Sequence, residues 1–201
     1  MTIVLATQNP KKAAEIRALL DLPGLNWKWP ADFPEAPQVV EDGETFEANA
    51  VRKARVWAEA TGDWALADDS GLEVDVLCGE PGVRSSRYAG ENADDAANIR
   101  KLLLEMEGET DRQARFHCVL ALAAPDGRVW TVEGRCDGRI STEPRGSNGF
   151  GYDPVFVPYG ADKTFGEMSP EEKNRFSHRA RALHAAREQW ADLLCGGRPS
   201  S

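Results

Sequence analysis

The sequence predicts a mixed α/β protein, because strand-like and helix-like segments alternate along its 201 residues. In several stretches apolar residues recur three and four positions apart, as on one face of a helix. Two apolar segments, 116–124 and 128–133, flank a Pro-Asp-Gly turn and predict a β-hairpin. The length fits one large domain or a domain of two lobes, with enough residues to bury a core.

The N-terminal part predicts a strand, a helix and then a second, longer helix. Residues 2–7 form an apolar run typical of a buried strand. Asn9 then fits a helix N-cap, with Pro10 at the first helical position. After a connecting segment rich in proline and tryptophan, apolar residues recur at helical spacing and predict a long helix from Thr45 to Thr61.

The middle of the chain predicts two strand segments followed by a helix. A short apolar run at 64–67 ends in two acidic residues, and residues 72–77 alternate apolar and acidic side chains as a half-buried strand does. An amphipathic helix is expected around 99–106.

Beyond the hairpin, a glycine-rich loop at 146–151 leads into a predicted strand, Pro154 to Val157. The sequence Ser-Pro-Glu-Glu at 169–172 is a capping box with proline at its first helical position. It predicts the start of a helical region that reaches about Leu194. We expect residues 1–195 to form a single domain and residues 196–201 a disordered tail.

Composition limits the classes of partner. The formal net charge of −9 opposes binding to nucleic acid and to anionic membranes, but not binding of a small anion by a local basic cluster. No apolar run approaches the ~20 residues that span a bilayer, and the N-terminus lacks a signal-peptide pattern. The four cysteines form no C-x-x-C pair, which favours reduced thiols and a cytoplasmic protein.

The segment Ala67-Asp68-Asp69-Ser70-Gly71-Leu72 is the most informative in the chain. At a strand end the alternation of side chains relaxes, so both acids can turn toward one site. Mg²⁺ takes oxygen ligands, usually one or two carboxylates with water and substrate phosphates. Acids near the start of the second helix, Glu41 among them, need no function but could supply another metal carboxylate.

Two further clusters have the composition of a binding site. Thr7, Asn9 and Lys12 surround a predicted helix N-terminus, which favours an anion, although an ordinary capped helix with a surface lysine is the more common explanation of such residues. Phe150 lies between two glycines, where its ring could stack a base or anchor the core.

A third group, near the start of the C-terminal helical region, is basic. Lys173, His178 and Arg179 lie on or near the first turns of this region. Lys173 and the pair 177–178 are four to five residues apart and can share one helix face, and the alternative is a solvated basic face. The glycine-rich loop matches neither a Walker A motif nor the Rossmann fingerprint.

Taken together, these clusters resemble the inosine triphosphate pyrophosphatase family, enzymes that hydrolyse non-canonical purine nucleoside triphosphates. The resemblance runs from Ile3 to about Leu183. The matching segments are Leu5-Ala6-Thr7-Gln8-Asn9 with Lys12 and Glu15; Thr45-Phe46 with Asn49-Ala50; Ala67 to Leu72; Pro81-Gly82-Val83; Arg87-Tyr88-Ala89-Gly90; Phe116-His117-Cys118; Gly149 to Pro154; Ser169 to Asn174; and Ser177-His178-Arg179.

The resemblance implies a reaction of nucleoside triphosphate with water to give the monophosphate and pyrophosphate, with Mg²⁺ that Mn²⁺ may replace. It implies Asp69 as the general base and Glu41 and Asp69 as metal ligands, with Asp68 as a further candidate. The implied substrate-binding residues are Thr7, Gln8, Asn9, Pro10, Lys11, Lys12, Ser70, Phe150, Gly151, Tyr152, Asp153, Lys173, His178 and Arg179.

The resemblance also implies an elongated mixed sheet flanked by helices, two lobes around a central cleft, and a homodimer. We expect His178 and Arg179 to donate to O6 of the base and Asp153 to accept from N1–H, which favours ITP, dITP and XTP over ATP. Two alternatives stay open: a nucleotide-binding sensor with weak turnover, and a pyrophosphatase for another modified nucleotide.

Overall fold

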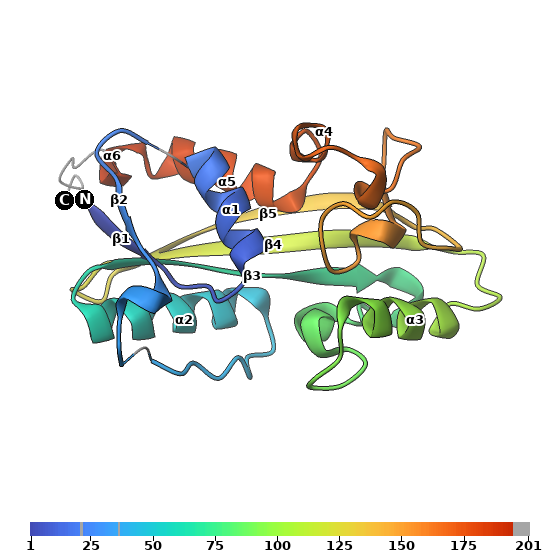
Figure 1. Cartoon of the computed structure of the whole chain (residues 1–201), viewed down its shortest axis with the longest axis horizontal. Helices are drawn as coiled ribbons and strands as arrows, with labels where there is room; N and C mark the ends of the chain where they lie inside the picture. Colours follow the sequence, from blue (N-terminus) through green and yellow to red (C-terminus); the bar gives the residue numbers. More distant parts are fainter. Residues whose placement is uncertain (21, 36, 195–201) are drawn as a thin grey trace. The chain divides into compact units, whose positions relative to one another are not determined.

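A computed structural model describes residues 1–20, 22–35 and 37–194 (Figure 1). Over these residues one six-stranded sheet has the strand order β2-β1-β3-β4-β5-β6. Strand β1 pairs in parallel with β2 and β3, whereas β5 and β6 are antiparallel, so the sheet is mixed. The strands are β1 (Thr2–Leu5), β2 (Asn26–Lys28), β3 (Trp64–Val74), β4 (Gln113–Ala123), β5 (Val129–Ile140) and β6 (Phe156–Pro158).

Helices flank this sheet, which confirms the predicted α/β class. Thr45 caps α2 by accepting a hydrogen bond from the Ala48 amide, and Ser169 caps α4 through the predicted capping box. The α-helices are α1 (Pro10–Leu20), α2 (Phe46–Thr61), α3 (Asp95–Glu105), α4 (Pro170–Asn174), α5 (His178–Gln189) and α6 (Ala191–Leu194).

Two predicted strands have different bounds in the structure. The strand expected at 72–77 is the second half of β3, which runs without a break through the acidic pair and ends at Val74. A 3₁₀ turn, Asp75–Leu77, follows it. The strand expected to start at Pro154 starts at Phe156, because residues 153–155 form another 3₁₀ turn.

The chain divides into two compact units. Unit 1 contains residues 1–69, 118–134 and the chain from 179 onward. In its core, β1 packs with α1 and α5 through buried apolar side chains such as Ile3, Ile16 and Leu183. Within this unit α1 and α5 lie on one face of the sheet and α2 lies on the other (Figure 1). This core therefore holds α1 and α5 against the strands.

Unit 2 contains residues 70–117 and 135–178. Its core is aromatic: the ring of Phe116 lies 4.7 Å from that of Phe156, which lies 5.2 Å from Phe165. Leu72 of β3 and Leu102 of α3 complete the same buried cluster. No helix among the described residues is both long and apolar enough to cross a membrane. The expected tail, 196–201, lies outside the described residues.

Candidate active site

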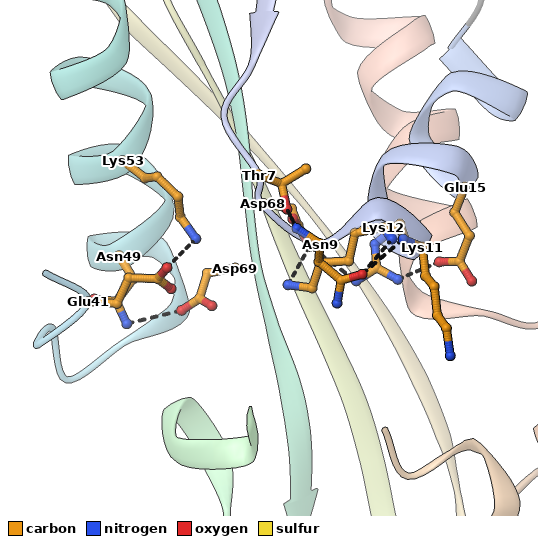
Figure 2. A network of polar contacts seen from close by, with 11 residues as sticks. Thr7, Asn9, Lys11, Lys12, Glu15, Glu41, Asn49, Lys53, Asp68 and Asp69 are labelled. Atoms are coloured by element: carbon orange, nitrogen blue, oxygen red, sulfur yellow. Dashed lines mark hydrogen bonds and ion pairs between the residues drawn. The ribbon is translucent and has the colours of Figure 1, made fainter. Parts of the chain in front are cut away.

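The acidic pair lies in the middle of β3 and not at a strand end, so the expectation that both acids turn toward one site is wrong. Neighbouring side chains of a strand point to opposite faces. Asp68 lies on the side of α1, whereas Asp69 faces Asn49 on α2 and the segment that carries Glu41 (Figure 2). Both carboxylates are buried, with exposed fractions of 1% and 6%. The two acids therefore have different partners and different chemistry.

Asp68 is held between two cations. Its Oδ2 lies 3.0 Å from Nζ of Lys12 and 3.1 Å from a guanidinium nitrogen of Arg179. Arg179 also pairs with Glu15 at 2.5 Å. Burial by itself would raise the pKa of Asp68, but the charges of Lys12 and Arg179 outweigh it and hold that pKa well below its usual range. Asp68 is therefore a permanent anion that orients Lys12.

The start of α1 forms the predicted capped helix terminus. The Asn9 carbonyl oxygen Oδ1 accepts hydrogen bonds from the backbone amides of Lys11 and Lys12 at 2.9 and 3.2 Å. Thr7 Oγ1 accepts one from the Asn9 amide at 3.2 Å. The cap satisfies these amides, so the positive charge that favours an anion at this helix end comes from the Lys12 ammonium and the helix dipole. Three candidates from the same segment are exposed: Gln8, Pro10 and Lys11.

Asp69 lies in a second polar network on the opposite face. Asn49 donates from Nδ2 to Asp69 Oδ2 at 3.0 Å, and Lys53 pairs with Glu41 at 2.9 Å. Burial raises the pKa of Asp69 to about 6, with Glu41 adding to the rise, while Lys53, Lys12 and the Asn49 hydrogen bond oppose it. A carboxyl group with a pKa near neutrality is suited to accepting and releasing a proton.

The residues fit a divalent cation in one of the two networks only. Glu41 lies close enough to Asp69 to raise its pKa, and two neighbouring carboxylates are the oxygen donors that Mg²⁺ prefers. Asp68 is already neutralised by Lys12 and Arg179, so we do not retain it as a ligand candidate. Within the described ranges, no group of three or more His, Cys, Asp or Glu side chains could hold a metal ion. Glu41 and Asp69 would therefore share a Mg²⁺ ion with oxygens of water or of substrate.

The net charge of the polar cluster in unit 1 also favours a bound cation. Its cationic side chains are Lys11, Lys12, Lys53 and Arg179, and its carboxylates are Glu15, Glu41, Asp68 and Asp69. These opposite charges balance, so the cluster has no positive excess with which to neutralise a triphosphate. A bound divalent cation would supply it.

In unit 2 the glycine-rich loop is built around a buried ion pair. Lys173 Nζ lies 2.7 Å from Asp153 Oδ2, and their exposed fractions are 6% and 2%. The same carboxylate oxygen accepts the Phe150 amide at 2.9 Å. A Cβ on Gly149 would lie 1.9 Å from this oxygen, and its φ of +76° also favours glycine. The loop conformation therefore depends on Asp153.

An ammonium and two aromatic rings also meet in this loop. Lys173 Nζ lies 5.0 Å from the centroid of the Phe150 ring and 5.6 Å from that of Phe165. Phe150 is only half-buried. An ammonium and a partly exposed ring beside each other can respectively donate to and stack on a planar heterocycle.

The remaining candidates of unit 2 have structural contacts of their own. His178 stacks on Phe116 with ring centroids 4.6 Å apart and is 4% exposed. Tyr152 donates its hydroxyl to the Ser85 carbonyl at 2.9 Å, and the Gly151 amide donates to Asp95 at 2.7 Å. Ser70 is half-buried in β3, directly after Asp69.

Arg179 has a different setting from the one we expected. Its guanidinium is 2% exposed and is paired with Asp68 and Glu15 in unit 1. Burial would lower its pKa, but Asp68 and its other acidic neighbours outweigh this and raise it. These buried pairs favour a role in holding Asp68 and Lys12 over direct donation to a base.

The sequence interpretation assigned no role to Asn49 or Lys53. Both lie on the apolar face of α2, three and seven positions after Phe46, and both are buried. Their positions in the sequence could have revealed them. A lysine and an asparagine at positions that helical spacing assigns to the buried face indicate a polar partner there, because such residues are rarely buried without one.

Comparisons with known proteins agree with this fold. A dITP/XTP pyrophosphatase of Geobacillus kaustophilus is 50% identical over 196 residues, which cover 96% of each chain. Another, of Bacillus subtilis, is 47% identical over 182 residues, covering 90% of this chain and 92% of that one.

Solved structures are similar over nearly the whole length. The Staphylococcus aureus Ham1 protein has a TM-score of 0.87 at 39% identity, covering 98% of this chain and 99% of its own. A HAM1 protein from Coxiella burnetii has a TM-score of 0.87 at 44% identity, covering 98% and 100%. The Ham1 family pattern itself matches residues 3–189, and the chain therefore belongs to the Ham1 family.

Proposed function

We propose that this protein hydrolyses non-standard purine nucleoside triphosphates, namely dITP, XTP and ITP, to the monophosphate and pyrophosphate. The observation that carries the proposal is Asp69, a buried carboxyl group that accepts a hydrogen bond from Asn49 and has a pKa raised to about 6, with the ion pair of Lys53 and Glu41 on the same side. The names of the relatives, dITP/XTP pyrophosphatases at about half identity over most of the chain, support the same substrates.

In the proposed reaction Asp69 accepts a proton from a water molecule as that water attacks the α-phosphorus. A new bond forms from the water oxygen to this phosphorus, and the bond from phosphorus to the α,β-bridging oxygen breaks. Pyrophosphate leaves with the electron pair of that bond. At pH 7 a carboxyl group with a pKa near 6 is mostly ionised, yet it is basic enough to take the proton.

The phosphates are proposed to bind at the start of α1. Lys12 and the positive end of the helix dipole supply charge, and Asp68 with Arg179 fixes where the Lys12 ammonium points. Lys53, on the Asp69 face, is a further cation for charge that develops in the transition state. Thr7 and Asn9 support this turn through the cap.

Mg²⁺ is the proposed cofactor, held by Glu41 and Asp69, and Mn²⁺ is expected to replace it. When bound, such a cation neutralises phosphate oxygens and lowers the cost of charge build-up at the α-phosphorus. Lys53 pairs with Glu41 at 2.9 Å and so holds that carboxylate on the same side as Asp69.

For the base, we propose the unit 2 cluster of Phe150, Asp153, Lys173 and His178. Lys173 is an ammonium beside the half-buried Phe150 ring, and an ammonium is the kind of donor that suits the O6 acceptor of hypoxanthine or xanthine. Adenine offers an amino donor at that position and would leave a buried ammonium facing a donor. Gly151, Tyr152 and Ser70 would act through loop shape and local contacts.

We retain three further predictions as part of this proposal: a homodimer, a cytoplasmic location, and no nucleic-acid partner. The net charge of −9 supports the last of these by electrostatic repulsion from phosphate backbones.

A panel of triphosphates with Mg²⁺ tests the function, scored separately for pyrophosphate and for single phosphate. We expect pyrophosphate from dITP, XTP and ITP, and kcat/KM for ATP lower by about 10⁴-fold or more. Chelation should abolish turnover and added Mg²⁺ should restore it. Tight binding without turnover would favour a sensor, and preference for another nucleotide would favour a different pyrophosphatase.

A further inference from the structure

We propose that Asn49 is a positioning residue for this reaction: its side-chain amide joins the segment that carries Glu41 to the carboxylate of Asp69. The inference rests on the proposed function, since it concerns the geometry of the same site. It assigns a role to a residue that neither touches phosphate in the proposed mechanism nor serves as a metal ligand.

The amide uses both of its ends. Asn49 Oδ1 accepts the backbone amide of Gly43 at 2.8 Å, and Nδ2 donates to Asp69 Oδ2 at 3.0 Å. A second, longer contact runs from Nδ2 to the Gly43 carbonyl at 3.4 Å. The Asn49 side chain thus connects the backbone of Gly43, two residues after Glu41, to the carboxylate of Asp69.

The setting makes this contact specific to asparagine. Asn49 is 1% exposed, on the first turns of a helix whose cap and apolar face fix its position. An aspartate would keep the acceptor but bring a second carboxylate against Asp69 in place of a donor. A glutamine would place the same groups one methylene too far out in a close-packed site.

Gly43 is the complementary part of the contact. A Cβ added there would lie 2.7 Å from Asn49 Oδ1 and 3.1 Å from the Ala48 Cβ. Unlike Gly149, Gly43 has no positive φ that would require glycine. The space that a methyl group would need is occupied by the Asn49 amide, which explains a glycine at this position.

The separation of Glu41 from Asp69 therefore depends on Asn49. Two carboxylates that share one cation must be held close together although they repel each other. Mutating a residue that orients metal ligands without binding the metal itself typically lowers metal affinity or activity by about 10–100-fold. A misplacement on the order of 1 Å can cost ~10²-fold in rate.

The test compares Asn49→Ala with Asn98→Ala in the full chain. Asn98 is a matched control: it is 3% exposed on α3 and bridges backbone groups, accepting from the Ala89 amide and donating to the Ser86 carbonyl. Neither of these hydrogen bonds involves a residue of the proposed site. Both truncations should lower stability to urea, but only Asn49→Ala should lower kcat for dITP, by roughly 10–100-fold with little change in KM.

Two further measurements separate positioning from general damage. Mn²⁺ binding to the free protein, followed by electron paramagnetic resonance, should weaken about tenfold or more in Asn49→Ala and stay unchanged in Asn98→Ala. Gly43→Ala should reproduce the kcat loss, and the double variant should be no worse than Asn49→Ala, because both break one contact.

The inference is overturned if folded Asn49→Ala keeps the parental kcat and Mn²⁺ affinity, or if Asn98→Ala shows equal losses. Failure of the proposed function has a different signature, since the parent protein itself would then not release pyrophosphate from dITP. In that case the Mn²⁺ measurement alone decides: weaker binding in Asn49→Ala supports the inference and unchanged binding overturns it.

Discussion

At the scale of single residues, Asp68 and Asp69 show how neighbours in sequence acquire opposite proton affinities. Both are buried, and burial raises the pKa of each. Asp68 has Lys12 and Arg179 in direct contact, and their charges reverse the effect. Asp69 has a neutral hydrogen-bond donor, Asn49, so burial prevails and its pKa rises to about 6. One acid is thereby a fixed anion and the other a usable base.

Asp69→Asn should remove proton transfer while preserving shape. We expect kcat for dITP to fall by roughly 10²–10⁴-fold, the usual contribution of a general base. Steady-state pyrophosphate release measures it, with circular dichroism to verify folding. Near-parental turnover in a folded Asp69→Asn protein would show that another group takes the proton.

The same substitution should stabilise the metal-free protein at neutral pH. The pKa of Asp69 is raised from 3.8 to about 6, so the folded state binds its proton more tightly and loses stability as pH rises through this window. The ionised Asp69 carboxylate therefore lowers the free energy of unfolding at pH 7 by at most ~3 kcal/mol, at ~1.4 kcal/mol per pKa unit. Below pH 4 this destabilisation is absent, because the carboxyl group is protonated in both the folded and the unfolded state.

Urea denaturation in chelator measures this difference. Asp69→Asn should exceed the parent at pH 7, and the gain should shrink as the pH is lowered toward 4. Glu59→Gln, which removes an exposed carboxylate from α2, should change neither curve. A gain that is equal at both pH values would mean that the Asp69 charge is not its source.

At the scale of elements, the conformation of the loop before β6 depends on the short helix α4. The capping box sets the first turn of α4, and this turn delivers Lys173 to Asp153. Asp153 in turn holds the Phe150 amide, and Gly149 leaves space for the Asp153 carboxylate. The capping box of α4 thus influences the conformation of the glycine-rich loop through the buried ion pair of Lys173 and Asp153.

Gly149→Ala and Gly151→Ala test this dependence as a matched pair. Both positions have positive φ, +76° and +58°, but a Cβ at Gly151 meets nothing within 4 Å. Gly151→Ala should cost about 1–2 kcal/mol of unfolding free energy, for backbone strain alone. Gly149→Ala should cost several kcal/mol, because it also displaces Asp153 from Lys173. Equal losses in urea denaturation would show that the ion pair tolerates the methyl group.

At the scale of the whole molecule, the chain contributes to each unit in several separate stretches. The strands β3, β4 and β5 each supply residues to both units. Each unit therefore needs strand pairing between segments far apart in the sequence, and neither core can form from one continuous stretch.

The proposed homodimer is the prediction that belongs to this scale. Sedimentation at micromolar concentration should give about twice the chain mass of 22.0 kDa, in line with the general preference for two-fold dimers. Catalytic parameters measured across the same concentrations would link assembly to activity. A monomer with full activity would contradict the prediction.

The sequence by itself determined the α/β class, most helix bounds and the segments proposed to form the site. Periodicity and capping chemistry are local, so Asn9, Thr45 and Ser169 marked helix starts that the structure has. The type of side chain indicated charge and donors, and the family resemblance then implied Lys12, Glu41, Asp69, Asp153 and Lys173 as site residues.

Only the tertiary structure decided how these side chains are paired. A continuous β3 placed Asp68 and Asp69 on opposite faces, although a break after the acids was expected. In the folded protein Arg179 forms ion pairs with Asp68 and Glu15, and Asn49 donates a hydrogen bond to Asp69. Proton affinity depends on desolvation and on charges from distant segments, and neither is encoded in the local pattern of residues.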